Sequence, residues 1–322
     1  MAVRVYQVHP QSPSQSHGIA MYHHQAPVLS VCWNEAIWER VKRKLMMISF
    51  LLHIQEGNKI FSGSVDNMGL MFDAVTGQST PFAQHDGAVK AVKWIYTPYG
   101  GVVATGSWDK TVKAGRPSDA QVHHVEFILQ FWDLRSPVPI STTLLPERCY
   151  TLDAQYPFLV VGTADRRIPV FDLGRSTTSY TLMMSSLRKQ TRVVSCCTGG
   201  FAAGGVEGRV AFQHVEEKNK KDDYTFKCHR QDLEPNVKDQ SLVYSINDIN
   251  FHPVHGTFST CGLNRASGPI VCSTFNSTGT LFVYAVSYDW YRGFTGMTTG
   301  HPNKLMVHLV KDEEVRKRVL RK

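Results

Sequence analysis

The sequence has few of the features that indicate an enzyme, a metalloprotein or a membrane protein. None of its 14 histidines stands in the H-E-x-x-H spacing of a zinc enzyme or in a C-x2-C…H-x3-H arrangement. It contains no glycine-rich phosphate loop. The longest apolar run, Leu45 to Ile54, is interrupted by Ser49 and His53 and is too short to cross a bilayer. We therefore expect no cofactor, no metal site and no membrane insertion.

The cysteines and the net charge indicate the cellular compartment and the kind of partner to expect. The seven cysteines form no C-x-x-C pair, and their odd number and irregular spacing indicate a reduced intracellular compartment rather than a disulfide framework. The N-terminus has no charged segment followed by an apolar one, so no signal peptide is expected. The net charge of +8 is compatible with an acidic partner such as nucleic acid, and equally with an ordinary basic surface.

One short motif returns four times along the chain. Each copy consists of a small residue, one intervening residue and an acid. The copies are Ser64-Val65-Asp66, Ser107-Trp108-Asp109, Thr163-Ala164-Asp165 and Gly205-Val206-Glu207, and their acidic positions lie 43, 56 and 42 residues apart. In the first and third copies an aromatic-Asp pair, Phe72-Asp73 or Phe171-Asp172, begins six residues after the acid.

The second copy is longer than the others. Its aromatic-Asp pair, Trp132-Asp133, begins 23 residues after the acid. Removing the 17 residues from Ala114 to Gln130 restores both the six-residue spacing and a period of 39. A period near 40 with such a turn and a closing aromatic-Asp pair is typical of a β-propeller built from WD repeats, in which each repeat forms a four-stranded blade. The predicted fold is therefore all-β.

The repeats predict a seven-bladed propeller over residues 1–310, followed by a basic C-terminal tail at 311–322. Two segments that interrupt the repeats, 36–55 and 114–130, are interpreted as insertions.

The first blade is predicted to be incomplete, because only one alternating strand, Val3 to Val8, precedes the next blade. A deletion is predicted near the sixth and seventh blades. There Cys261-Gly262 should be followed by a turn and a closing strand, but the chain proceeds directly to the next blade.

The acidic turns have a structural interpretation. In a WD blade the turn Asp, an upstream His and a strand Ser or Thr are hydrogen-bonded to the Trp of the closing strand. The residues predicted for this role are His85, Ser107, Asp109 and Trp132, with Asp66 and Asp165 at equivalent turns. They would satisfy buried polar groups, each of which costs roughly 1–3 kcal/mol when unpaired. A catalytic Ser-His-Asp triad is the alternative, but the pattern recurs in each repeat whereas an active site does not.

Two clusters interleave aromatic residues with cations in predicted loops. They are Phe226-Lys227-Cys228-His229-Arg230 and Tyr288-Asp289-Trp290-Tyr291-Arg292. Such a combination can hold a phosphate and stack on a base or on a partner's side chain. Anchoring of each loop by a buried aromatic residue explains the same pattern without a partner, and the sequence leaves both explanations open.

Several segments of the chain closely resemble those of one family, the WD-repeat mRNA export factors of the nuclear pore. The resemblance covers about residues 26 to 292 in the family's order. It rests on segments that include Gln84-His85-Asp86-Gly87, Thr105-Gly106-Ser107-Trp108-Asp109-Lys110-Thr111, Leu145-Pro146-Glu147-Arg148-Cys149-Tyr150, Phe226-Lys227-Cys228-His229-Arg230, Phe251-His252-Pro253-Val254-His255-Gly256 and Ser287-Tyr288-Asp289-Trp290.

The resemblance implies a non-enzymatic scaffold in nuclear export of mRNA, located in the nucleus and at the nuclear pore and shuttling to the cytoplasm. It implies that the propeller binds a segment of a phenylalanine-glycine nucleoporin and contacts RNA. By the same resemblance, Arg230, Phe251, Trp290 and Arg292 lie on the side that faces these partners. At the position of Arg292 the family often has Lys, which keeps the charge and changes the shape.

Two rival functions stay open at this point. The sister family, the propeller subunit of the spindle checkpoint, shares the Phe226–Arg230 segment and the segment that begins at Glu207. It implies an adaptor for mitotic checkpoint proteins at kinetochores. A substrate adaptor of a ubiquitin ligase is a further role common among WD propellers.

Overall fold

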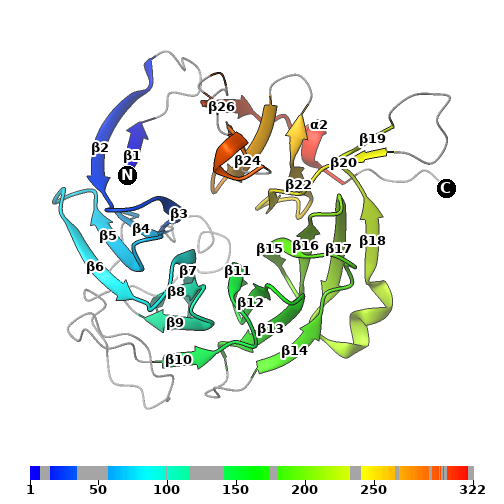
Figure 1. Ribbon diagram of the computed structural model, residues 1–322. Helices are drawn as coiled ribbons and strands as arrows, with labels where there is room; N and C mark the ends of the chain where they lie inside the picture. The colour runs from blue at the N-terminus through cyan, green and yellow to red at the C-terminus, as the bar shows by residue number, and fades with distance from the viewer. Residues whose placement is uncertain are drawn as a thin grey trace, which may run out of the picture. The chain divides into compact units, whose positions relative to one another are not determined.

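The computed structural model describes residues 1–7, 15–34, 57–98, 100–115, 141–174, 180–232, 241–264, 268–289, 292–296, 298, 300 and 303–317. The chain divides into two compact units. The first contains Met1–Tyr6 and Gly18–Leu144, and the second contains Gln7–His17 and Leu145–Lys322. Nearly all regular structure in both units is antiparallel β-sheet (Figure 1). None of the described helices is long and apolar enough to cross a membrane.

The first unit holds two four-stranded sheets and a two-stranded one. The strands are β1 (Ala2–Gln7) with β2 (His17–His23), then β3 (Val28–Trp33), β4 (Lys59–Ser64), β5 (Met68–Asp73) and β6 (Ser79–Gln84), then β7 (Val89–Thr97), β8 (Gly100–Ser107), β9 (Thr111–Gly115) and β10 (Ser141–Leu144). In both four-stranded sheets each strand pairs with the next one along the chain, as expected for a blade.

The second unit repeats this arrangement. Two complete sheets contain β11 (Cys149–Gln155), β12 (Phe158–Thr163), β13 (Arg167–Asp172) and β14 (Tyr180–Met184), and β15 (Thr191–Cys197), β16 (Gly200–Gly205), β17 (Arg209–His214) and β18 (Tyr224–Lys227). The 3-10 helix η2 (Glu217–Asp222) connects the last two strands. In Figure 1 the two sheets lie side by side.

The remainder of the second unit has two two-stranded sheets and one further four-stranded sheet. Its strands are β19 (Arg230–Asp232) with β20 (Ser241–Val243), β21 (Asp248–Phe251) with β22 (Phe258–Cys261), and β23 (Leu263–Asn264), β24 (Gly268–Phe275), β25 (Leu281–Val286) and β26 (Lys304–Leu309). The β21–β22 sheet has two strands where a complete blade has four. This is the place where the sequence predicts a deletion.

The predicted insertions fall mainly outside the described residues. This is true of the whole of 36–55 and of residues 116–130. Ala114, the predicted first residue of the second insertion, belongs to β9 and pairs with Ser141 of β10. The strand therefore continues two residues into the segment that the repeat period assigns to the insertion, because Ala114 and Gly115 both extend its pairing with β8.

The first part of the predicted C-terminal tail is attached to the second unit. Asp312–Val315 form the short helix α2. The carboxylate of Asp312 lies 2.7 Å from Nε2 of His255, and the carbonyl of Val315 accepts a hydrogen bond from the hydroxyl of Thr257. Residues 318–322 lie outside the described range.

The first strand of more than two residues in each four-stranded sheet carries a β-bulge near its start. The register to the second strand shifts between Val28 and Ser30, Val89 and Ala91, Cys149 and Thr151, Thr191 and Val193, and Ile270 and Cys272. A bulge bends a strand and increases its twist at a fixed place. Its recurrence identifies β3, β7, β11, β15 and β24 as equivalent first strands.

A glycine stands three residues before the acid of each motif, and packing explains it. A Cβ atom built on Gly63 would lie 2.6 Å from Cγ1 of Val89 on β7. At Gly204 it would lie 2.8 Å from side-chain atoms of Ile246 and Val193. At these positions the second strand of the sheet (β4 or β16) lies so close to the side chains opposite it that only glycine fits.

Candidate partner-binding loop

The exposed loop after β25 is organised around one buried tyrosine. Tyr288 is 3 % exposed, and its hydroxyl donates to the carbonyl of Gly293 at 3.0 Å while accepting the backbone N–H of Arg292 at 2.9 Å. The hydroxyl of Thr295 donates to the carbonyl of Arg292 at 3.0 Å. Gly293 has a φ of 65°, which glycine adopts without strain. These contacts hold the backbone of Arg292, which is itself exposed, in one conformation.

Arg192 supports the same loop from a different strand. It lies on β15, and its guanidinium donates to the hydroxyl of Ser245 and to the carbonyl of Asp289, both at 3.1 Å. Burial lowers the pKa of Arg192, and the nearby Asp289 carboxylate opposes that shift. A half-buried guanidinium thus fixes the residue that immediately precedes Trp290.

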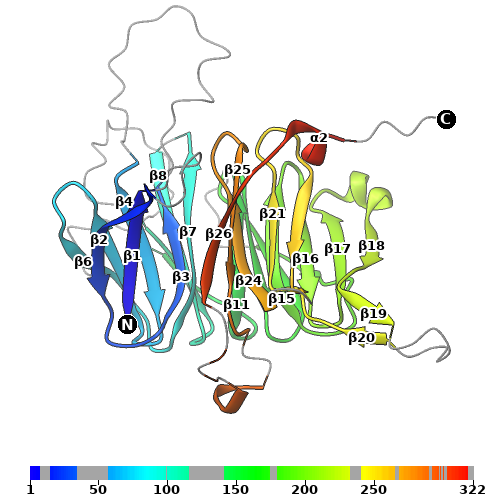
Figure 2. The same ribbon diagram turned by 90° about the horizontal axis from the view of Figure 1, so that it is seen from above.

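The four predicted partner-facing residues have different surroundings. Arg230 begins β19, is exposed, and donates to the carbonyl of Glu207 at 2.8 Å. Phe251 ends β21 and is half-buried, with its ring 5.2 Å from that of Phe258. Arg292 lies in the Tyr288 loop, and Trp290 lies outside the described residues. In Figure 2 the short η3 turn (Phe294–Gly296) and the β19–β20 hairpin project from the same end of the strands, opposite α2.

Phe251 belongs to an apolar cluster, which limits how much of it a partner can reach. The cluster contains the buried residues Ile246 and Ile249, and Phe226 and Phe258 pack against it. A half-buried ring of this kind contributes both to the core and to a surface. Of the four residues, the two arginines present charge directly to solvent.

The predicted structural residues of the second repeat form a buried network. Nδ1 of His85 lies 2.9 Å from a carboxylate oxygen of Asp109, and Nε2 lies 2.9 Å from the hydroxyl of Thr105. The hydroxyl of Ser107 donates to the carbonyl of Gly87 and accepts the N–H of Asp109. The strand hydroxyls that contact the imidazole are therefore those of Thr105, two residues before the predicted Ser107, and of Thr111 at 3.1 Å. Trp132 lies outside the described residues.

The electrostatics of this pair follow from burial. Burial lowers the pKa of His85, although the carboxylate of Asp109 opposes the shift. For Asp109 burial raises the pKa, but hydrogen bonds from Thr111 and His85 outweigh it and leave the pKa lowered. At neutral pH the network therefore joins a neutral imidazole to an ionised carboxylate. Its hydrogen bonds stabilise the turn that carries Asp109.

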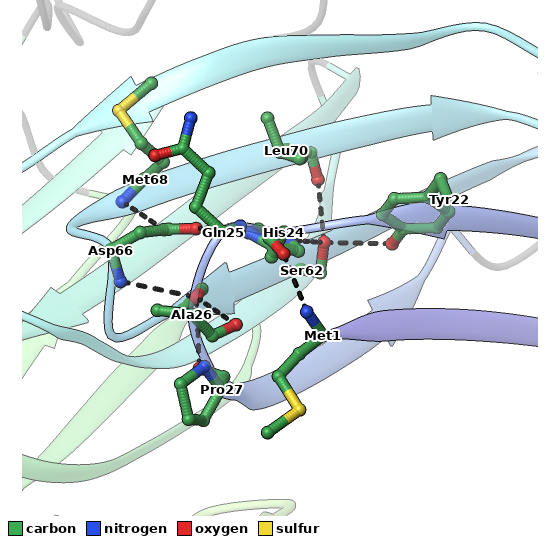
Figure 3. A network of polar contacts seen from close by, with 11 residues as sticks. Met1, Tyr22, His24, Gln25, Ala26, Pro27, Ser62, Asp66, Met68 and Leu70 are labelled. Carbon is green, nitrogen blue, oxygen red and sulfur yellow. Dashed lines mark hydrogen bonds and ion pairs between the residues drawn. The ribbon is translucent and has the colours of Figure 1, made fainter.

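The first repeat has the same kind of network, for which the sequence predicted Asp66 but not His24 or Ser62 (Figure 3). His24 contacts Asp66 at 3.2 Å and the hydroxyl of Ser62 at 2.8 Å, and that hydroxyl also accepts a hydrogen bond from Tyr22 at 2.9 Å. Burial raises the pKa of Tyr22 to about 12. The spacing Ser62-x-Ser64-x-Asp66 matches Thr105-x-Ser107-x-Asp109, and this match in the sequence predicts the same network in both repeats.

In the last two copies of the motif, the described residues include no histidine bonded to the acid. In the third copy the hydroxyl of Thr163 donates to Asp165 at 2.6 Å. In the fourth copy Glu207 accepts the backbone N–H groups of Arg188 and Lys189 at 2.7 and 3.1 Å. Within the described residues, no group of three or more His, Cys, Asp or Glu side chains has the arrangement of a metal site.

Comparison with known proteins agrees with this architecture. The model of the WD domain, G-beta repeat, matches residues 77–114. The chain is 39 % identical to the Poly(A)+ RNA export protein of Schizosaccharomyces pombe over 98 % of its own length and 84 % of that protein. It is 35 % identical to mRNA export factor GLE2 of Chaetomium thermophilum, covering 98 % of this chain and 82 % of that one. The chain belongs to the family of WD-repeat mRNA export factors.

Further matches agree with the family and the fold. Protein Rae1 of Drosophila melanogaster is 36 % identical over 83 % of this chain and 72 % of that protein. Among solved structures, a chain of the Mitotic Checkpoint Complex superposes with a TM-score of 0.58 at 11 % identity, covering 88 % of this chain and 79 % of that one. At that identity the match shows the fold alone. This export factor therefore has the all-β WD40 propeller fold.

Proposed function

We propose that this protein is a non-enzymatic scaffold in the nuclear export of messenger RNA. Family membership supports the process, because the names of the relatives refer to export of mRNA or poly(A)+ RNA. The networks of His85 and Asp109 and of His24 and Asp66 support the non-enzymatic part. They repeat from one repeat to the next, and their polar atoms are bonded to one another and to turn backbone.

The observation that carries the binding proposal is the Tyr288 loop. It presents the exposed Arg292 from a backbone fixed by the Tyr288 hydroxyl and by Arg192. A preordered cation loses little entropy on binding, so its contact contributes more to affinity. We assign the nucleoporin segment to a surface that includes Trp290 and Arg292, and RNA phosphates to Arg292 and Arg230. Phe251 ends β21 beside the turn that contacts α2, at the other end of the strands from the Tyr288 loop (Figure 2), and its contact with a partner stays a separate prediction.

The cellular setting follows from this role. The protein would reside in the nucleus and at the nuclear pore and shuttle to the cytoplasm, with a phenylalanine-glycine nucleoporin and RNA or ribonucleoprotein as partners. A seven-bladed ring with insertions at 36–55 and 114–130 belongs to the same proposal. The checkpoint and ubiquitin-ligase roles stay predictions without a specific observation in their favour.

Binding assays with three proteins test the proposal. A nucleoporin peptide pull-down and an RNA titration would compare the wild type with Trp290→Ala and with the double variant Arg230→Ala/Arg292→Ala. Central Trp and Arg residues typically lose about 2 kcal/mol or more on truncation. Each arginine removed should also reduce the log-log salt slope of RNA binding by about one. Unchanged binding by folded variants in both assays would contradict the proposal and show that the aromatic residues only anchor the loop.

A further inference from the structure

His229 occupies the position in its repeat that His24 and His85 occupy in theirs. Those two histidines each follow the last strand of one sheet, and Nε2 of each lies within 2.9 Å of a hydroxyl on the second strand of the next sheet. His229 follows β18, and its Nε2 lies 3.1 Å from the hydroxyl of Thr260 on β22, the second strand of the β21–β22 sheet. His229 is therefore the equivalent histidine of this repeat.

The acid that completes the network of His85 is missing from the repeat of His229. Asp109 comes four residues after the hydroxyl of its network, and the same step from Thr260 leads to Asn264. No described residue forms a hydrogen bond with Nδ1 of His229, the atom that corresponds to the one bonded to Asp109. Within the described part of the chain, the imidazole of His229 is therefore held by Thr260 alone.

The backbone of His229 determines the direction in which the next residue, Arg230, leaves the turn. Its φ of 48° lies in the left-handed region, which a residue other than glycine adopts at a cost in free energy. Such a conformation persists only where surrounding contacts fix it. Here the carbonyl of His229 accepts the N–H of Tyr244 at 3.0 Å, and the imidazole is hydrogen-bonded to Thr260. Both contacts hold the turn that leads into β19.

The imidazole of His229 is packed against its own unit and does not present a charge to a ligand. A Cβ atom built on Gly262 would lie 2.8 Å from its Nδ1, so the ring lies directly against the backbone of the segment after β22. Burial lowers the pKa of His229, and a hydrogen bond with the backbone of Thr260 opposes that shift. The ring is therefore neutral at neutral pH, and its effect on an anionic ligand is indirect.

Arg230 has few contacts of its own to fix it. It is exposed and begins β19, which pairs with β20 over only three residues. A two-stranded hairpin of this length is not stable by itself. The guanidinium has one hydrogen bond to a described residue, which it donates to the carbonyl of Glu207. The preceding residue therefore has a large share in placing it.

We propose that His229 is a positioning residue for Arg230. The imidazole, bonded to Thr260, holds the left-handed turn from which Arg230 reaches an RNA phosphate. This role rests on the RNA contact proposed for Arg230. Because position 264 carries Asn in place of an acid, this network is weaker than that of His85, and an acid there should strengthen it.

A double-mutant cycle tests the positioning role. A fluorescein-labelled oligoadenylate is titrated against the full chain and against the variants His229→Ala, Arg230→Ala and the two combined. Arg230→Ala should reduce the log-log salt slope by about one. His229→Ala should weaken binding about two- to tenfold, which corresponds to the cost of ordering one long side chain. Once Arg230 is absent, it should cause no further loss.

Each outcome of the cycle has one meaning. Equal losses from His229→Ala with and without Arg230 would show that the histidine only stabilises the fold, and would overturn the proposal. Weakening by Arg230→Ala alone would overturn the positioning role and leave the RNA contact intact. No effect of Arg230→Ala would overturn both.

A matched pair of variants replaces His229→Ala if that protein fails to fold. Thr260→Val removes the hydroxyl that holds the imidazole and keeps the shape of the side chain, so it should weaken RNA binding at least about twofold. Thr105→Val removes the equivalent hydroxyl beside His85 and should leave RNA affinity unchanged. Equal RNA affinity of the two folded variants would overturn the proposal.

Position 264 tests the equivalence of the repeats. Asn264→Asp should raise the melting temperature by about 2–4 °C, because the acid gains the imidazole of His229 as a partner. The gain should disappear in the His229→Ala background. No gain, or a gain that persists without the imidazole, would overturn the equivalence on which the proposal stands.

Discussion

Buried and half-buried polar side chains form different kinds of hydrogen bonds in the two units. In the first unit His24 and His85 each join a turn carboxylate to a strand hydroxyl, and the resulting networks stay inside the repeat. In the second unit Arg192 and Tyr288 direct their hydrogen bonds to an exposed loop. The first arrangement stabilises a turn, whereas the second prepares a surface.

The turns of the second unit show that the histidine is not required for the fold. At the fourth motif copy, Glu207 receives two backbone N–H groups and the turn still connects β16 to β17. A turn can thus be held by a carboxylate hydrogen-bonded to a buried imidazole, or by backbone donors together with an ion pair to Arg209. The free energy of unfolding should depend more strongly on one side chain, and on pH, for the turn with the imidazole than for the turn at Glu207.

Removing the buried imidazole should have the largest effect on stability. We expect His85→Ala to lower the free energy of unfolding by about 2–3 kcal/mol, because it takes one buried hydrogen-bond partner from the Asp109 carboxylate and another from the Thr105 hydroxyl. Glu207→Gln, at the equivalent turn of the second unit, should cost about 1 kcal/mol. Urea denaturation followed by circular dichroism measures both. Equal losses would remove the distinction between the two kinds of turn.

The motif glycines should be required equally in both units. Gly63→Ala and Gly204→Ala each place a methyl group within 2.8 Å of a neighbouring side chain, so we expect a loss of about 2 kcal/mol from each. Gly300 has no atom within 4 Å of a built Cβ and provides the control, Gly300→Ala, with little change. A loss at only one of the two motif glycines would show that the sheets pack differently in the two units.

The Tyr288 hydroxyl should matter for binding more than for folding. Tyr288→Phe removes both hydrogen bonds that order Arg292, so RNA affinity should fall about tenfold through the entropy of reordering the loop. The free energy of unfolding should change by less than about 1 kcal/mol. Tyr96→Phe, on an exposed side chain of the first unit, is the matched control. If Arg292→Ala weakens RNA binding and Tyr288→Phe does not, the hydroxyl has no positioning role.

The smallest expected effect is on the pH dependence of stability. Since burial lowers the pKa of His85, the folded state keeps this imidazole neutral while the unfolded chain protonates it near pH 6.5. The unfolded state then binds more protons, so the His85 contribution is present above pH 6.5 and is lost progressively as the pH falls below 6.5. His229, whose pKa burial also lowers, adds a similar dependence. The slope measured in His85→Ala should therefore be shallower than in the wild type, and an unchanged slope would exclude His85 as its source.

The sequence predicts the parts of this fold that repeat locally. The four acidic turns and the His85–Asp109 pair follow from spacing, because each lies within one repeat. The close packing at Gly63 and Gly204 involves a neighbouring repeat, and spacing alone does not show which side chain lies opposite. Arg192 had no local signal, since the Asp289 carbonyl that it contacts is 97 residues away in the sequence.

The contact between Arg192 and Asp289 also couples ligand binding at the Tyr288 loop to the stability of the sheet that contains β15. A ligand that binds only the ordered loop stabilises every state in which that contact is intact, by an amount that grows with the logarithm of its free concentration. Nucleoporin or RNA bound at the loop should therefore raise the melting temperature of the β15–β18 sheet and slow its amide exchange. A cell that keeps the export factor occupied would, by mass action, also protect it from proteolysis.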